Sequence, residues 1–116
     1  MQSVNLINDA RYTDDRAEVL HAVKTDQLTV DGVYLKANQS TGWSKNPDGD
    51  RVYLCLQGGG ELILETAAAG NELRIALSPG AVALAPRGTY HSLTGGASGM
   101  VCSAVARFPV RVIERG

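Results

Sequence analysis

Short stretches of alternating apolar and polar residues recur along the chain between glycine and proline turn signals. A period of two is typical of strands with one buried face, and the spacing of an amphipathic helix is nearly absent. Residues 14–21 allow a helix, but their apolar spacing also fits a strand. We expect strands at 28–30 and 33–35, separated by a turn or bulge near Asp31 and Gly32.

An apolar run at 51–57 is followed by three glycines and then by a second run at 61–65. Two such runs around a glycine turn predict a β-hairpin. Gly70 and Asn71 suit a further turn at 67–72. The remaining pattern predicts strands at 73–77, 81–85, 100–108 and 110–113, turns at 79–80 and 86–88, and a loop at 94–99. This succession favours an all-β barrel or sandwich.

The 116 residues predict one domain, with 44% hydrophobic residues available for a core. With 11 basic and 12 acidic residues the net charge is -1, which gives no reason to expect nucleic acid or an anionic membrane as partner. No apolar stretch approaches the roughly 20 residues that span a bilayer. The polar start does not resemble a secretory signal, so we expect a cytoplasmic protein with Cys55 and Cys102 as reduced core thiols.

A spaced motif runs from Gly80 through Pro86 and Gly88 to His91. Glycine permits the tight turns at its two positions, and proline fixes φ at the end of a strand. The stretch resembles the second conserved motif of the cupin superfamily, G-x5-P-x-G-x2-H-x3-N, as far as the histidine. Gly95 stands at the final asparagine position. In a cupin, the histidine points into the barrel and binds a metal ion.

The first cupin motif, G-x5-H-x-H-x4-E-x6-G, can be laid over residues 38–58. Its last glycine matches Gly58, but Ser44 and Asn46 replace the two histidines and Arg51 replaces the glutamate. The resemblance implies a cupin-type β-barrel, a jelly-roll-like double-stranded β-helix. It divides the chain into an arm and first strand (1–24), the barrel (25–108), and a tail or edge strand (109–116).

We expect no metal cofactor of the usual cupin kind. A typical cupin metal has three imidazoles and one carboxylate, and His91 alone remains of the four ligands. Arg51 in the glutamate position would repel a cation by several kcal/mol at about 4 Å, taking an effective dielectric near 20. The alternative is an unorthodox ligand set that combines His91 with Asp48, Asp50 or Cys55.

If Arg51 faces the cavity, strand alternation predicts that Tyr53 and Cys55 do so too. The expected ligand-binding residues are Trp43, Ser44, Asn46, Arg51 and Cys55, with His91 and Tyr53 as candidate catalytic residues. A guanidinium beside hydroxyls, an amide and an imidazole suits a carboxylate, a phosphate or a polar sugar-like molecule.

Each of these residues also has a structural interpretation. Arg51 could pair with an acid at the barrel mouth, and Tyr53 and Cys55 could fill the core. Likewise His91 could be a packing residue, and Trp43 could contact a partner subunit. His21 lies in an apolar stretch and is expected to be structural or to lie at an interface.

Three functions therefore remain open. The first is a metal-independent cupin that binds a small polar or anionic ligand, either without catalysis or as an isomerase, epimerase or lyase. The second is a metal-dependent, dioxygenase-type cupin with unorthodox ligands that include His91. The third is a non-catalytic structural or regulatory cupin. We also expect a homodimer, in which the arm before Arg16 or the tail at 110–113 covers a sheet edge.

Overall fold

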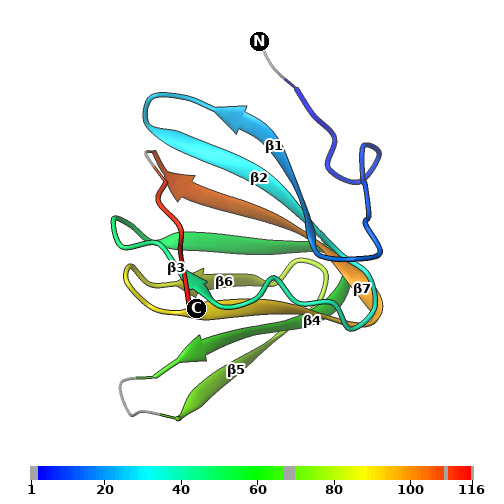
Figure 1. The fold of residues 1–116 in the computed structure, drawn as a ribbon. Helices are drawn as coiled ribbons and strands as arrows, with labels where there is room; N and C mark the ends of the chain where they lie inside the picture. The colour runs from blue at the N-terminus through cyan, green and yellow to red at the C-terminus, as the bar shows by residue number, and fades with distance from the viewer. Residues whose placement is uncertain (1–2, 67–69, 109, 116) are drawn as a thin grey trace.

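The computed structural model describes residues 3–66, 70–108 and 110–115, and these form eight β-strands and no helix (Figure 1). All strand pairs are antiparallel. The expected all-β class is therefore confirmed, and the ambiguous stretch at 14–21 runs into a strand. The strands are β1 (Glu18–Lys24), β2 (Leu28–Leu35), β3 (Ser44–Lys45), β4 (Arg51–Glu65), β5 (Glu72–Leu77), β6 (Val82–Ala85), β7 (His91–Arg107) and β8 (Ile113–Glu114).

Two long strands, β4 and β7, each take part in two curled layers of the barrel. The first half of β4 pairs with β6 and with the second half of β7, which in turn pairs with β2. The second half of β4 pairs with β5 and with the first half of β7, which contacts β3. We call the order β1–β2–β7–β4–β6 sheet I and the order β8–β3–β7–β4–β5 sheet II.

Glycines bend both long strands where they pass between the sheets. Gly58 and Gly99 have φ of 72° and 73°. A Cβ on Gly60 would lie 2.0 Å from the carbonyl oxygen of Thr94, so only glycine lets the two backbones approach this closely. The predicted hairpin across residues 58–60 and the predicted loop at 94–99 are therefore wrong. These glycines bend continuous strands instead of ending them.

The predicted break near Asp31 and Gly32 is also wrong, because β2 is continuous from Leu28 to Leu35. The irregularity lies in the neighbouring strand, where the register of β1 shifts between His21 and Val23. Gly32 has a packing role: a Cβ there would lie 2.8 Å from Tyr34 Oη and 2.9 Å from a methyl carbon of Leu6. The glycine thus makes room for the N-terminal arm on the outer face of sheet I.

Other expectations hold. Gly80 and Gly88 have positive φ and lie in turns, as the motif required. The strands at 73–77, 81–85 and 100–108 correspond to β5, β6 and the second half of β7. The expected strand at 110–113 is reduced to β8, which pairs with β3. The predicted turn at 67–72 falls partly on residues 67–69, which lie outside the described residues.

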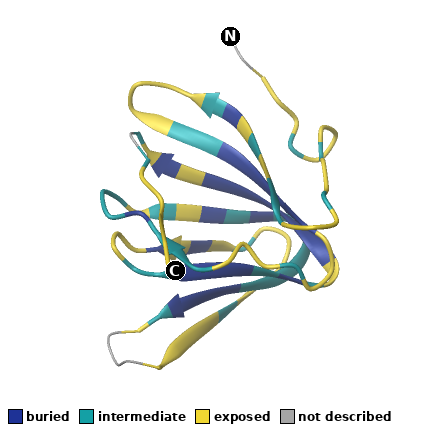
Figure 2. Ribbon diagram, in the orientation of Figure 1, coloured by how far each residue is buried: buried dark blue, intermediate teal, exposed yellow. Residues whose placement is uncertain are grey.

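Apolar side chains fill the space between the two sheets near the bends, and Figure 2 shows much of β7 as buried. The core members with least exposure include Leu35, Leu62, Leu93, Met100, Cys55 and Cys102. The two cysteines are buried free thiols that face one another across β4 and β7, in agreement with the sequence. Burial raises the pKa of the Cys102 thiol to about 12, which keeps it protonated.

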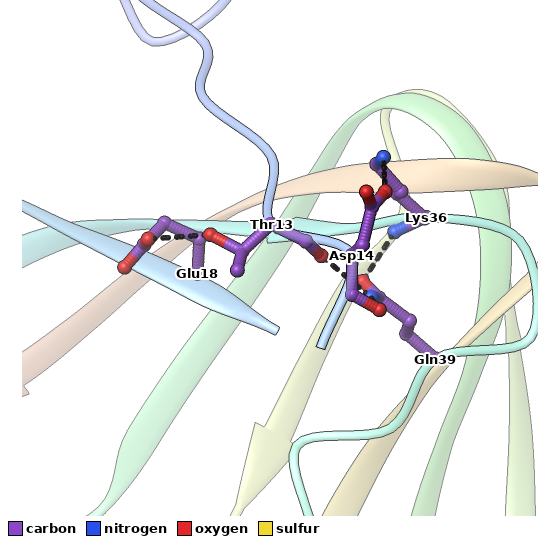
Figure 3. A network of polar contacts seen from close by, with 5 residues as sticks. All are labelled: Thr13, Asp14, Glu18, Lys36 and Gln39. Carbon is purple, nitrogen blue, oxygen red and sulfur yellow. Dashed lines mark hydrogen bonds and ion pairs between the residues drawn. The ribbon is translucent and has the colours of Figure 1, made fainter. Parts of the chain in front are cut away.

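The N-terminal arm packs against its own chain. Tyr34 Oη donates to the carbonyl oxygen of Leu6 at 2.7 Å. Figure 3 shows the second anchor, in which Gln39 Nε2 donates to the carbonyl oxygens of Thr13 and Asp14, and Lys36 forms an ion pair with Asp14. These contacts already give the arm a place within the monomer, and the homodimer stays a prediction. The described residues contain no helix that could cross a membrane.

Candidate ligand site

A cavity of about 890 Å³ opens on the inner face of sheet I. The segment 41–44 and the C-terminal tail at 110–115 form its other side, and Figure 1 shows this tail in red running from the end of β7 toward β3. Hydrogen bonds hold the tail against the rest of the chain at two points. Arg111 makes two hydrogen bonds to Asp48, at 2.6 and 3.0 Å, and the backbone N–H of Arg115 donates to the carbonyl oxygen of Trp43 at 3.0 Å.

Two small residues on β7 hollow out the floor of this cavity. Ala104 lies between Asp31 of β2 and Tyr53 of β4 in the strand register, and Ala106 lies in the same way between Thr29 and Arg51. Since side chains that share a face of a sheet stand beside one another, an alanine between two longer residues leaves the space above it empty. The neighbours can then reach across it.

Arg51 does reach across. Its Nη2 lies 3.5 Å from Asp31 Oδ2, and both side chains are largely buried, with exposed fractions of 15% and 10%. The pair is a single long contact, and the Arg51 Nε–H, also buried, has no hydrogen-bond partner within the described chain. The other Asp31 oxygen lies 3.1 Å from His21 Nδ1, while the imidazole is 85% exposed. The floor therefore has the order Arg51, Asp31, His21.

A second polar contact crosses the barrel interior. Tyr53 of sheet I lies 2.9 Å from His91 Nε2, on the sheet II portion of β7. His91 Nδ1 lies 3.1 Å from the carbonyl oxygen of Thr89, which only accepts hydrogen bonds. The proton of a neutral ring therefore sits on Nδ1, and the Tyr53 hydroxyl donates to Nε2. This contact uses both ring nitrogens of His91.

Both members of this pair favour their neutral forms. Burial lowers the pKa of His91, and the nearby Arg51 charge lowers it further, although the hydrogen bond to Thr89 acts in the opposite direction. Burial raises the pKa of Tyr53, a shift that Arg51 partly offsets. At neutral pH the site thus holds a neutral imidazole and a protonated phenol.

The sequence-predicted site residues separate into two groups. Trp43, Ser44, Arg51 and Tyr53 line the cavity. Three others do not line it. His91 contacts the hydroxyl of Tyr53, and Cys55 is buried in the core. Asn46 is buried, and its side-chain oxygen accepts a hydrogen bond from the N–H of Asp48. The inward alternation of Arg51, Tyr53 and Cys55 agrees with the sequence analysis, since the three are buried or nearly so and Val52 is exposed.

Sequence reasoning missed Asp31 and His21, which line the same cavity. The sequence pattern places Asp31 at a break between two strands, and it predicts that His21 is structural or lies at an interface. The available signal was a buried-strand pattern interrupted by a carboxylate, since an Asp in an apolar strand needs a partner. Identifying that partner required the register that sets His21 opposite Asp31.

The residues at the cupin metal position do not fit a divalent ion. His91 has both ring nitrogens engaged, Ser44 and Asn46 offer no imidazole, and the Arg51 cation lies beside Tyr53. The candidates for an unorthodox set are engaged elsewhere, with Asp48 bonded to Arg111 and Asp50 accepting from the backbone of Arg87. Among the residues that the structure describes, no three His, Cys, Asp or Glu side chains gather as a metal site.

The two curled antiparallel sheets share bent strands and enclose a cavity at one end, which is the arrangement of a double-stranded β-helix. The protein therefore has the cupin fold. Solved structures agree. A rmlc-like cupin protein from Desulfovibrio desulfuricans is 25% identical, with a TM-score of 0.78 over 92% of this chain and 96% of that one. An uncharacterized conserved protein with a double-stranded β-helix domain from Klebsiella pneumoniae is 14% identical, with a TM-score of 0.83 over 100% and 98%.

The fold also occurs in proteins of different function. An oxalate oxidase in complex with the substrate analogue glycolate is 13% identical and has a TM-score of 0.79 over 97% of this chain and 62% of that one. No family model matches the sequence, and no curated protein matches it. The sequence resemblance to cupins is thus confirmed, and the fold alone does not define an activity.

Proposed function

We propose that this cupin binds a small anionic ligand in the cavity on sheet I, without the metal ion of its superfamily. The observation that carries the proposal is the largely buried guanidinium of Arg51 on the cavity floor, held by one long ion pair and with its Nε–H unpaired. A buried cation with unused hydrogen-bond donors carries a desolvation cost unless a ligand or counter-ion pairs with it. A carboxylate or phosphate matches the fork of its N–H groups.

The charge of the cavity supports an anion. Its lining contains three cations (Lys24, Arg51 and Arg115) and two carboxylates (Asp31 and Glu114), so the cations exceed the carboxylates by one. The whole chain has a net charge of -1. The lining is therefore more positive than the rest of the protein, and this difference favours entry of an anion.

Binding of glycolate and inorganic phosphate to isotope-labelled protein, followed by NMR, tests the proposal. Arg51→Met should lower the affinity at least tenfold, whereas Arg74→Met, which removes an exposed ion-paired arginine on β5, should leave it unchanged. Asp31→Asn should tighten binding several-fold, because it removes the carboxylate that competes for Arg51. Equal affinity in wild type and Arg51→Met would overturn the proposal.

Metal independence has its own measurement. Elemental analysis of protein purified without a chelating resin should give a substoichiometric content of Fe, Mn, Ni and Zn. Glycolate affinity should stay the same after treatment with EDTA. A stoichiometric ion that is lost in His91→Gln would instead support a metal-dependent cupin with unorthodox ligands.

A second candidate function is acid–base catalysis by Tyr53 and His91, and the hydrogen bond between them favours it. Tyr53 lines the cavity, so its hydroxyl oxygen could take a proton from a bound ligand. The Tyr53 hydroxyl would at the same time transfer its own proton to His91 Nε2. Burial opposes the imidazolium that would result, so simple binding is the better-supported function. The discriminating measurement is deuterium incorporation from D2O at the carbon beside the ligand carboxylate, which Tyr53→Phe would abolish if the pair is catalytic.

A further inference from the structure

Part of the cavity wall is apolar and stays uncovered. Val19 on β1 and Val112 in the C-terminal tail line the cavity, yet their exposed fractions are 40% and 52%. They belong to segments at opposite ends of the chain that meet at one opening. Apolar side chains exposed inside a concave site are typical of ligand-binding surfaces, because an apolar ligand group removes them from water.

Within sheet I, the polar and apolar residues of the lining lie in separate cross-strand rows. In the register of sheet I, His21 and Asp31 form one cross-strand row, and the next row toward the bends is Val19 and Val33. On the other side of the polar row lie Val23 and, beyond the end of β7, Phe108. The floor of sheet I therefore offers a compact set of polar groups at Arg51, Asp31 and His21, with valines beside it, while Lys24, Glu114 and Arg115 carry the other charges of the lining.

The tail segment that carries Val112 is also held in place. Trp43 and Tyr90 stack on the guanidinium of Arg115, with distances of 5.0 and 4.6 Å to the ring centroids, and Arg115 forms an ion pair with Glu65. On the opposite wall, the Lys24 ammonium lies 4.8 Å from the centre of the Phe108 ring. A wall fixed before binding spares the ligand the entropic cost of ordering it.

We propose that the ligand is an amphiphilic monocarboxylate. Its carboxylate meets Arg51, and its hydrocarbon part extends between β1 and the C-terminal tail against Val19 and Val112. This inference rests on the proposed function for its anionic end, and it adds the apolar end. One negative charge matches the excess of one cation over the carboxylates in the lining, and a cavity of about 890 Å³ is within the usual range for ligands larger than glycolate or phosphate.

The test is a binding series followed by NMR with propanoate, hexanoate and octanoate, together with hexanol as an uncharged probe. Affinity should rise about threefold to fourfold for each added methylene until the apolar wall is covered. Val19→Ser and Val112→Ser should each weaken octanoate binding about threefold or more and leave propanoate binding nearly unchanged. Val82→Ser is the matched control, because Val82 is 65% exposed but lies on β6 outside the cavity.

The outcomes separate the two proposals. If all the acids bind with one affinity that depends on Arg51, the amphiphile is ruled out and the anion site stands. If hexanol binds as tightly as hexanoate, the apolar wall is supported and the anionic proposal fails. If no probe binds, both are overturned. A Val82→Ser effect equal to that of Val112→Ser would also count against the amphiphile, since it would show a general change in stability.

Discussion

The two ends of sheet I are built on the same alternation but have different interiors. Toward the bends, the inward positions are Val33, Leu35, Cys55, Met100 and Cys102, and they are closely packed. Toward the other end, the inward positions are Thr29, Asp31, Arg51 and Tyr53 around two alanines of β7. The strand order and the backbone pairing continue from one end to the other. Side-chain size and charge alone therefore make one end a core and the other a site.

Removing a large core side chain should give the largest effect on stability. Leu35 is fully buried near the bends of sheet I, and Leu35→Ala should lower the free energy of unfolding by about 3–5 kcal/mol through lost burial and the cavity left behind. Urea denaturation followed by circular dichroism measures this. A loss below about 1 kcal/mol would mean that this end is as loosely filled as the hollow one.

Removing one member of the Arg51–Asp31 ion pair at the hollow end should lower stability by a smaller amount. Arg51→Met should lower the free energy of unfolding by about 2 kcal/mol, because Asp31 loses a partner but keeps His21. Adding Asp31→Asn to Arg51→Met should restore part of this loss. The double-mutant cycle gives the coupling energy, and a value near zero would show that the two charges act independently.

The smallest expected effect is a pH dependence that comes from His91. Burial lowers its pKa in the folded state below the ordinary value of 6.5, so below that pH the unfolded chain binds a proton that the folded chain does not. The contribution to stability is complete above 6.5 and decreases as the pH falls. Its slope is at most about 1.4 kcal/mol per pH unit.

The comparison for this prediction is His91→Gln, which keeps a polar side chain but does not titrate. Between pH 7 and 5, in the region of the ordinary pKa of histidine, the stability of wild type should fall more steeply than that of the variant. Thermal denaturation in a series of buffers measures both. Parallel curves would mean that His91 takes up a proton as readily in the folded protein as in the unfolded one.

The sequence predicted the fold class, most strand positions and the inward face of β4, because these depend on alternation and on local turn residues. It failed at the bends. A glycine that ends a strand and a glycine that bends one both adopt a positive φ. Gly58 and Gly99 differ from the turn glycines because the backbone of another strand passes close to them. That proximity is a property of the assembled barrel.

The site was predicted in part for the same reason. Arg51 and Tyr53 follow from the motif and from strand alternation. Asp31 and His21 join them through the pairing of β1 with β2 and of β2 with β7, and the tail enters through its contacts with Asp48 and Trp43. Pairings between distant segments are set by the whole fold, so no short stretch of sequence reports them.

The passage of β4 and β7 through both sheets has a consequence for folding. Neither sheet can detach while the other stays intact, since each would take half of the same two strands with it. We therefore expect backbone amides in both sheets to exchange with deuterium through one shared opening reaction. The pairing of β2 with the end of β7 joins residues such as Leu28 and Arg107, so chain collapse must close a long loop before the barrel can form.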